Sequence, residues 1–204
     1  KVTNKWDTGL YLHGNIRNKK IDDNNDNFLD APLTKQVNIM NRWQYTDMEK
    51  GWVSFINLRY LTDNKTTGEI DFDSDIHKNT TTFWGSEIAT ERFETSLKLG
   101  YVFPDLPYKS FGLQLAYSSH NQDSYFGLKE YAINQKSVYA NLLYNSIISD
   151  TRNKFTTGIS TTFDAIDELV LINNYERKEK SVGAFFEYNY DNLTNLSLSA
   201  GIRI

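Results

Sequence analysis

The sequence has no cysteine, only three prolines among its 204 residues and no long apolar run. Without cysteine there are no disulfides, no thiolate metal sites and no cysteine nucleophiles. No stretch approaches the roughly 20 consecutive apolar residues that a transmembrane helix needs, and the mean hydropathy is −0.56. The 22 Lys and Arg residues are outnumbered by 26 Asp and Glu residues, so there is no basic field for nucleic acid. These absences argue against a disulfide scaffold, a helical membrane protein and a nucleic-acid partner.

What the chain has instead is aromatic residues and a two-residue alternation. It contains 13 Tyr, 12 Phe and 4 Trp, a composition that suits strands with an amphipathic surface. In residues 93–103, almost every second residue is apolar or aromatic, and most of the others are polar, charged or Gly. An extended strand with this period has one apolar face and one polar face.

The alternation predicts nine strands, and no helical period competes with it. The nine segments are 8–18, 37–45, 52–61, 93–103, 111–118, 138–144, 155–163, 182–190 and 196–204. Their polar faces are rich in Ser, Thr, Asn, Gln and Gly and carry a few charged residues. The charged residues are Arg42, Arg59, Glu94, Lys98, Glu187 and Arg203. These residues could line a pore, hold a plug or pair with one another inside a barrel.

The connections between these segments alternate in length. The short ones are 46–51, 104–109, 149–154 and 191–195, and the long ones are 19–36, 62–92, 119–137 and 164–181. Short periplasmic turns and long extracellular loops are typical of an outer-membrane barrel. We therefore predict an all-β fold, an antiparallel transmembrane β-barrel in the bacterial outer membrane.

A soluble β-sandwich is the alternative, because it also alternates apolar and polar residues. Sandwich cores tend to be aliphatic, whereas aromatic residues stand near the ends of these apolar faces, as at Phe103, Tyr117, Tyr144 and Tyr190. Aromatic girdles occupy that position at membrane interfaces. The aromatic ends, the polar opposite faces and the alternating loops favour the membrane barrel.

The number of strands bears on whether this barrel is whole. Bacterial single-chain barrels have an even number of strands, and the alternation is unfinished at Ile204, while Lys1 and Val2 look like the end of an earlier strand. We therefore expect residues 1–204 to be part of one larger transmembrane barrel domain. The alternative is a small, complete eight-stranded barrel with a frayed ninth segment and a structural or adhesive role.

The sharpest local motif is the acidic segment 22–30, which reads DDNNDNFLD. Oxygen-bearing side chains at every second position resemble the first nine positions of an EF-hand loop, and a hard cation such as Ca²⁺ takes six to eight oxygen ligands. Asn27 stands where that loop favours Gly, and no Glu follows at the twelfth position. The motif predicts a structural calcium site, and a solvated polar loop is the alternative. The predicted ligands are Asp22, Asn24, Asp26, the carbonyl of Phe28, and Asp30.

No catalytic constellation is apparent, so we do not expect an enzyme. The sequence lacks G-x-S-x-G, H-E-x-x-H and a phosphate-binding Gly loop. An outer-membrane hydrolase is a less favoured alternative, for which His120 with Ser118 or Ser119 would supply the nucleophile and base. His13, His77 and His120 are too dispersed to suggest a shared metal site.

One region carries a family resemblance. Residues 26–36 read DNFLDAPLTKQ and lead to Asn41-Arg42-Trp43. This stretch resembles the barrel of TonB-dependent outer-membrane receptors of Bacteroidota, of the vitamin, siderophore and metal-uptake type. Their pattern is a D-x-N-x-D-G-F-x-D-x-P loop that leads into an N-R-W strand. Residues 63–68 are similar to the D-x-x-x-G-G stretch after the next strand, with Thr67-Gly68 in place of the double Gly. The match spans residues 22–68.

The resemblance implies a parent receptor with a 22-stranded barrel closed by an N-terminal plug. Such a receptor imports a scarce nutrient (a siderophore, cobalamin or a metal complex) with energy from the inner-membrane TonB complex. The implied partners are outer-membrane lipids, the rest of the barrel and the plug, the TonB complex through the parent, and a small nutrient ligand. Neither the plug nor the energy-coupling segment lies within these 204 residues.

Overall fold

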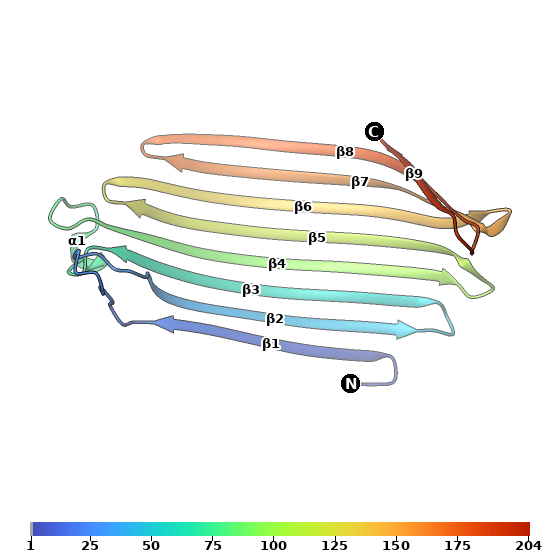
Figure 1. Ribbon diagram of the computed structural model, residues 1–204, viewed down its shortest axis with the longest axis horizontal. Helices are drawn as coiled ribbons and strands as arrows, with labels where there is room; N and C mark the ends of the chain where they lie inside the picture. Colours follow the sequence, from blue (N-terminus) through green and yellow to red (C-terminus); the bar gives the residue numbers. More distant parts are fainter. Residues whose placement is uncertain (1) are drawn as a thin grey trace.

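Nine antiparallel strands form a single sheet in the computed structural model, which describes residues 2–204 (Figure 1). Each strand is hydrogen-bonded to the next one along the chain. The strands are β1 (Trp6–Arg17), β2 (Leu33–Asp47), β3 (Trp52–Gly68), β4 (Gly85–Phe103), β5 (Leu106–Phe126), β6 (Lys129–Ile148), β7 (Asp150–Val170), β8 (Asn173–Asp191) and β9 (Ser197–Arg203), and the short helix α1 is Ser74–His77. All nine predicted strands are confirmed. Of the two residues expected to end an earlier strand, Lys1 lies outside the described residues and Val2 is not in a strand.

The sheet is open. Within residues 2–204, β1 and β9 are edge strands that do not pair with each other. The all-β antiparallel fold is therefore confirmed, whereas these residues do not close into the small eight-stranded barrel considered above. No helix in the described part of the chain is long and apolar enough to cross a membrane.

Two of the predicted long loops are wrong. β5 and β6 continue to a two-residue turn at Gly127–Leu128, and β7 and β8 continue to one at Leu171–Ile172. The strands extend to 21, 20, 21 and 19 residues. Polar residues stand on both faces of these extensions and apolar ones are irregularly spaced, so the period that marks a strand fades while the backbone ladder continues. The other two long connections persist as 18–32 and 69–84, and the four short turns are confirmed.

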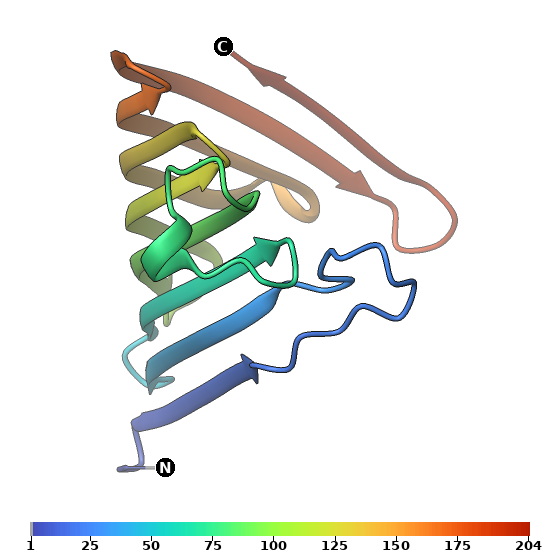
Figure 2. The ribbon, with the colours of Figure 1, turned by 90° about the vertical axis from the view of Figure 1, so that its left-hand side faces the viewer.

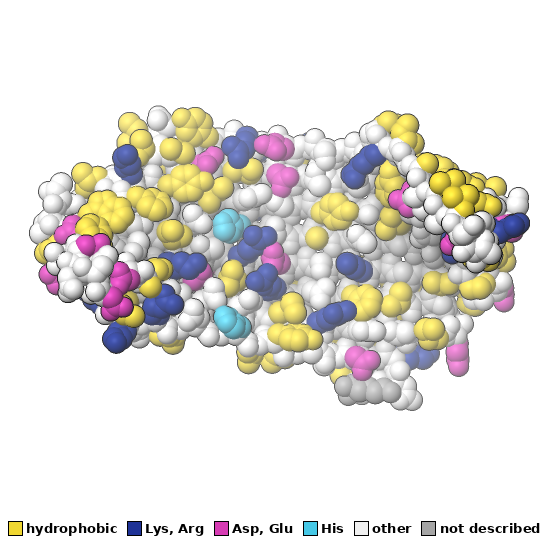
Figure 3. Space-filling model, in the orientation of Figure 1, with side chains coloured by type: hydrophobic (Ala, Val, Ile, Leu, Met, Phe, Trp, Pro, Cys, Tyr) yellow, Lys and Arg dark blue, Asp and Glu magenta, His cyan; other side chains and the backbone are white. Residues whose placement is uncertain are grey.

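The sheet is curved, and its two faces differ. Viewed from the side, the sheet curves, β9 curls over its concave side, and the 18–32 loop projects toward that side (Figure 2). The concave face carries many charged and polar side chains among scattered apolar ones (Figure 3). The alternating apolar side chains of the predicted strand segments lie on the convex face, because register partners share one side of a sheet.

Little of the apolar surface is buried. Among the described residues, only Phe72, Tyr125 and Ile166 are buried apolar side chains. On the convex face, Leu12 is 70% exposed and Ile159 is 56% exposed. A soluble domain of this size would bury such a face under a second layer, and no second layer covers it here.

Candidate functional site

The convex face carries a continuous apolar band. It runs from Trp6 to Ile16 on β1, from Phe93 to Phe103 on β4, and from Val182 to Tyr190 on β8. Aliphatic side chains occupy its middle, where Ile56, Leu97 and Leu115 are consecutive register partners across β3, β4 and β5. The band therefore occupies nine to eleven residues of a strand, the length that crosses a bilayer in a tilted β-strand.

Aromatic rings border the band at the end with the short turns, which we call the short-turn border. Most of them form a chain of ring contacts with centroids 4.7–6.0 Å apart, from β3 to β8. The members of the chain are Trp52, Tyr101, Phe103, Phe111, Tyr144, Phe155 and Phe186. Trp6 makes the same kind of contact with Trp43 and Tyr45. Girdles of aromatic residues flank the apolar zone of outer-membrane barrels.

The opposite border, which we call the long-loop border, steps steadily from strand to strand. It lies at Ile16 on β1 and at Val182 on β8. The cross-strand row that contains Ile16 reaches β8 at Asn174, eight residues before Val182 and seven strand-to-strand steps away. At ~3.3 Å per residue and ~4.8 Å per strand, this offset means that the strands are tilted by roughly 38° from the direction perpendicular to the border of the band.

The short-turn border steps in the same direction. The row that contains Trp6 reaches β8 at Ala184, six residues before Tyr190. Both borders are thus oblique to the strands, so the band keeps its height across the sheet. A tilt of about 35–45° is the one that transmembrane barrels adopt.

The concave face holds the six charged residues that the alternation assigned to the polar side. Glu94 is the centre of an ion-pair cluster: Arg59 Nη1 donates to its Oε2 at 3.1 Å, and Arg92 Nε donates to its Oε1 at 2.8 Å. Elsewhere, Arg42 lies over the ring of Phe55 at 4.8 Å. A hollow of about 460 Å³ adjoins the cluster. The expected interior ion pairing is therefore present at Glu94, and the hollow beside it offers charged and polar contacts.

The residues of the hydrolase alternative divide between the two faces of the sheet. His120 and Ser118 lie on the concave face, whereas Ser119 points to the convex face. The Nδ1 atom of His120 is buried and has no hydrogen-bond partner among the described residues. Burial, followed by the charge of Arg92, lowers the pKa of His120. The structure therefore does not show a carboxylate orienting this imidazole.

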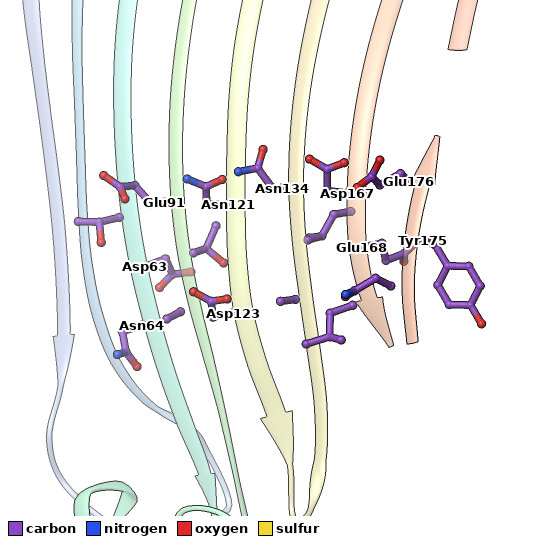
Figure 4. A pocket seen from close by; sticks show the side chains of 17 residues that line it. Asp63, Asn64, Glu91, Asn121, Asp123, Asn134, Asp167, Glu168, Tyr175 and Glu176 are labelled. Carbon is purple, nitrogen blue, oxygen red and sulfur yellow. The ribbon is translucent and has the colours of Figure 1, made fainter. Parts of the chain in front are cut away.

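The strand extensions beyond the long-loop border form a polar surface that the sequence pattern missed. Glu91, Asn121, Asn134, Asp167 and Glu176 are successive register partners from β4 to β8, and they line a shallow hollow of about 730 Å³ (Figure 4). Each comes from a segment that was predicted as loop or from its edge. Strand pairing brings together partners that lie 9–33 residues apart in the sequence, so only the register reveals the row.

The acidic loop is folded by its own side chains. The Asp22 carboxylate accepts the N–H groups of Asp26 at 3.2 Å and Asn27 at 3.0 Å, and Asp26 Oδ1 accepts that of Phe28 at 2.8 Å. Asn25 and Asn27 have φ of 58° and 65°, as Asn tolerates. Asp30 accepts the N–H of Asp23 at 2.7 Å. Within residues 2–204, no three His, Asp or Glu side chains are grouped as a metal site. Calcium binding stays a prediction.

This loop is tied to the 69–84 loop. Phe28 forms an isolated bridge with Glu69, and its ring lies 6.2 Å from that of Trp84. Trp84 therefore packs one loop against the other. Tyr125 and Tyr131 lie in β5 and β6, where Tyr125 donates to Glu87 at 3.3 Å and Tyr131 to Glu168 at 2.8 Å.

Comparison with known proteins adds no relative. No family model matches the chain, and no curated protein and no solved structure gives a significant match. A functional assignment consequently depends on the geometry of the two faces and on the resemblance of residues 22–68.

Proposed function

We propose that this chain is a membrane-embedded section of the β-barrel of a TonB-dependent outer-membrane receptor that imports a scarce nutrient. The observation that carries the membrane part is the oblique apolar band on the convex face. An eleven-residue strand segment of ~3.3 Å per residue, tilted by roughly 38°, spans about 28 Å, and a nine-residue segment spans about 23 Å. The apolar zone of outer-membrane barrels is ~25 Å tall.

A soluble sandwich does not account for this arrangement. A second sheet would pack ~10 Å from the apolar face and cover it, yet Leu12 and Ile159 are largely exposed. A sandwich also has no need for a band that is oblique to the strands and edged by aromatic rings. Lipid is the cover that fits both the height of the band and its aromatic border.

The receptor part of the proposal draws on two further features. Residues 22–68 resemble the barrel of these receptors, and the concave face presents the polar surface expected of an aqueous lumen. In the proposal the nine strands belong to a 22-stranded barrel. Its remaining strands pair with the two open edges, and its plug closes the lumen. The transported siderophore, cobalamin or metal complex would contact that larger assembly.

Cysteine scanning tests the membrane part, since the chain has no native cysteine. Single cysteines at Leu113 and Leu115 in vesicles should be protected from a charged, membrane-impermeant thiol reagent. Cysteines at Asn121 and Asp123, on the same face beyond the border, should react freely. Reactivity in denaturant supplies the control for each site. Equal labelling at 115 and 121 would contradict a lipid-covered band.

The receptor part has a separate test. An antibody against this sequence should detect, in the outer-membrane fraction, a native polypeptide much larger than the 23.7 kDa of this chain. A native protein of 23.7 kDa would exclude the receptor and leave the membrane-embedded sheet standing.

A further inference from the structure

Three lysines stand immediately beyond the long-loop border of the apolar band. Lys35 precedes Val37 on β2, Lys136 precedes Val138 on β6, and Lys180 precedes Val182 on β8, and each lysine is the next convex-face residue past the band. All three are exposed. Among the described residues, no carboxylate lies within ion-pair distance of any of them.

The three lysines lie on one line, parallel to the border. The cross-strand row of Lys35 reaches β6 at Ala132, four residues from Lys136 and four strand steps away. The row of Lys136 reaches β8 at Lys178, two residues from Lys180 and two steps away. The offset is one residue per strand in both intervals, close to the slope of the border itself. In a bilayer the three ammonium groups therefore lie at one depth.

Most carboxylates of the same face lie farther out. Glu91 is the exception: it is the next convex-face residue past Phe93 on β4, at the level of the lysines, and its Oε1 accepts the hydroxyl of Tyr60 at 2.6 Å. Farther along β4, Glu87 accepts from Asn64 and Tyr125. Lys180 Nζ instead lies 5.5 Å from the centre of the Phe163 ring, at the edge of the band. Unpaired cations therefore stand between the apolar band and most of the acidic surface.

We propose that Lys35, Lys136 and Lys180 form a level rim that binds the phosphate headgroups of anionic membrane lipids. The inference rests on the proposed membrane embedding and names the lipid chemistry that this surface takes. A lysine stem can lie along apolar surface while its ammonium reaches the headgroup level. Phosphates of anionic lipids occupy that level, and each lysine near such a surface gains about fivefold in affinity. Because ~19 Å and ~10 Å separate the strands that carry them, the lysines contact different lipid molecules.

The test compares vesicles of phosphatidylcholine alone with vesicles of equal parts phosphatidylcholine and phosphatidylglycerol. The full chain carries K35Q, K136Q and K180Q together, and its matched control carries K50Q, K98Q and K154Q, with the same change in charge. Tryptophan emission reports insertion. We expect the preference of the wild-type chain for anionic vesicles to fall on the order of 100-fold in the rim variant. The control should retain its preference.

Each remaining outcome overturns the rim. An equal loss in rim and control variants means a general charge effect, and no loss means that other groups contact the headgroups. Inorganic phosphate that displaces the chain better than chloride at equal ionic strength means a free-phosphate site. If the wild-type chain fails to enter neutral vesicles, the proposed membrane embedding fails too. If it enters them and the rim variant keeps the anionic preference, only the rim fails.

Discussion

The ring of Phe155 on β7 stacks on that of Phe186 on β8, with centroids 5.7 Å apart and planes 20° from parallel. The pair ends the chain of ring contacts that begins at Trp52. Phe186 remains 41% exposed and lies four residues before Tyr190, inside the apolar band. The two rings therefore hold β7 to β8 within the part of the sheet that we expect lipid to cover.

The stacked pair should contribute coupling energy beyond the area that each ring buries. In a double-mutant cycle with Phe155→Ala and Phe186→Ala, we expect an interaction energy of about 1 kcal/mol. Urea unfolding of the chain from phospholipid micelles provides the four free energies. Additive single effects would show that the rings are neighbours without energetic coupling.

A charge on the convex face should be far more harmful than one on the concave face. Leu115→Arg places a guanidinium in the apolar band and should reduce the free energy of unfolding in vesicles by about 2–4 kcal/mol. Ala116→Arg, one residue along β5, faces the polar side and lines the concave hollow, so it should cost less than about 1 kcal/mol. Equal costs would contradict the assignment of the two faces.

Neutralising Glu94 should leave Arg59 and Arg92 without their shared partner. Because all three side chains are partly exposed, the loss from Glu94→Gln should be about 1 kcal/mol, larger at low salt than at high salt. The control is Glu187→Gln on the same face, whose carboxylate accepts from Asn189 at 2.7 Å without an ion pair. Identical salt dependence in both variants would argue against the cluster.

Tyr125 should make the chain sensitive to alkali. Burial and the neighbouring Glu87 raise the pKa of Tyr125 to about 12, against ~10 in the unfolded chain. Its contribution to stability is therefore present below pH 10 and is lost as the pH rises toward 12. Tyr125→Phe should abolish this part of the alkaline loss, measured by urea unfolding at successive pH values. An unchanged alkaline profile would mean that Tyr125 titrates normally.

Calcium binding by the 22–30 loop is testable with terbium as a luminescent substitute. Since the Phe28 ring lies 6.2 Å from that of Trp84, a bound Tb³⁺ should be sensitised by this tryptophan and displaced by Ca²⁺. Asp22→Asn with Asp26→Asn should remove the signal, and Asp71→Asn in the neighbouring loop should keep it. Absence of sensitised emission in the wild-type chain would leave the segment as a solvated loop.

The apolar positions of the nine strands were predictable because the side-chain period is a local property. Phe93, Leu97 and Tyr101 had to share a face in any extended strand. The extensions beyond the long-loop border were not predictable in this way. There, consecutive residues such as His120 and Asn121 lie on opposite faces and are both polar. Hydrogen bonds between the backbones hold them in the sheet, and no side-chain pattern records those bonds.

The candidate sites also differ in whether the sequence alone could reveal them. The acidic loop was found from spacing alone, since its residues are contiguous. The row from Glu91 to Glu176 and the rim of Lys35, Lys136 and Lys180 join residues that are distant in the chain. Their alignment depends on the register of four or more strand pairs.

By itself, the sequence determined that the chain forms strands and which side of each strand is apolar, because these follow from the two-residue period of the polypeptide. The tertiary structure decided the register, and with it the oblique course of the band, its aromatic border and the level line of lysines. Register is set by hydrogen bonding and packing between strands, and a shift of one residue would move every side chain of a strand to the opposite face.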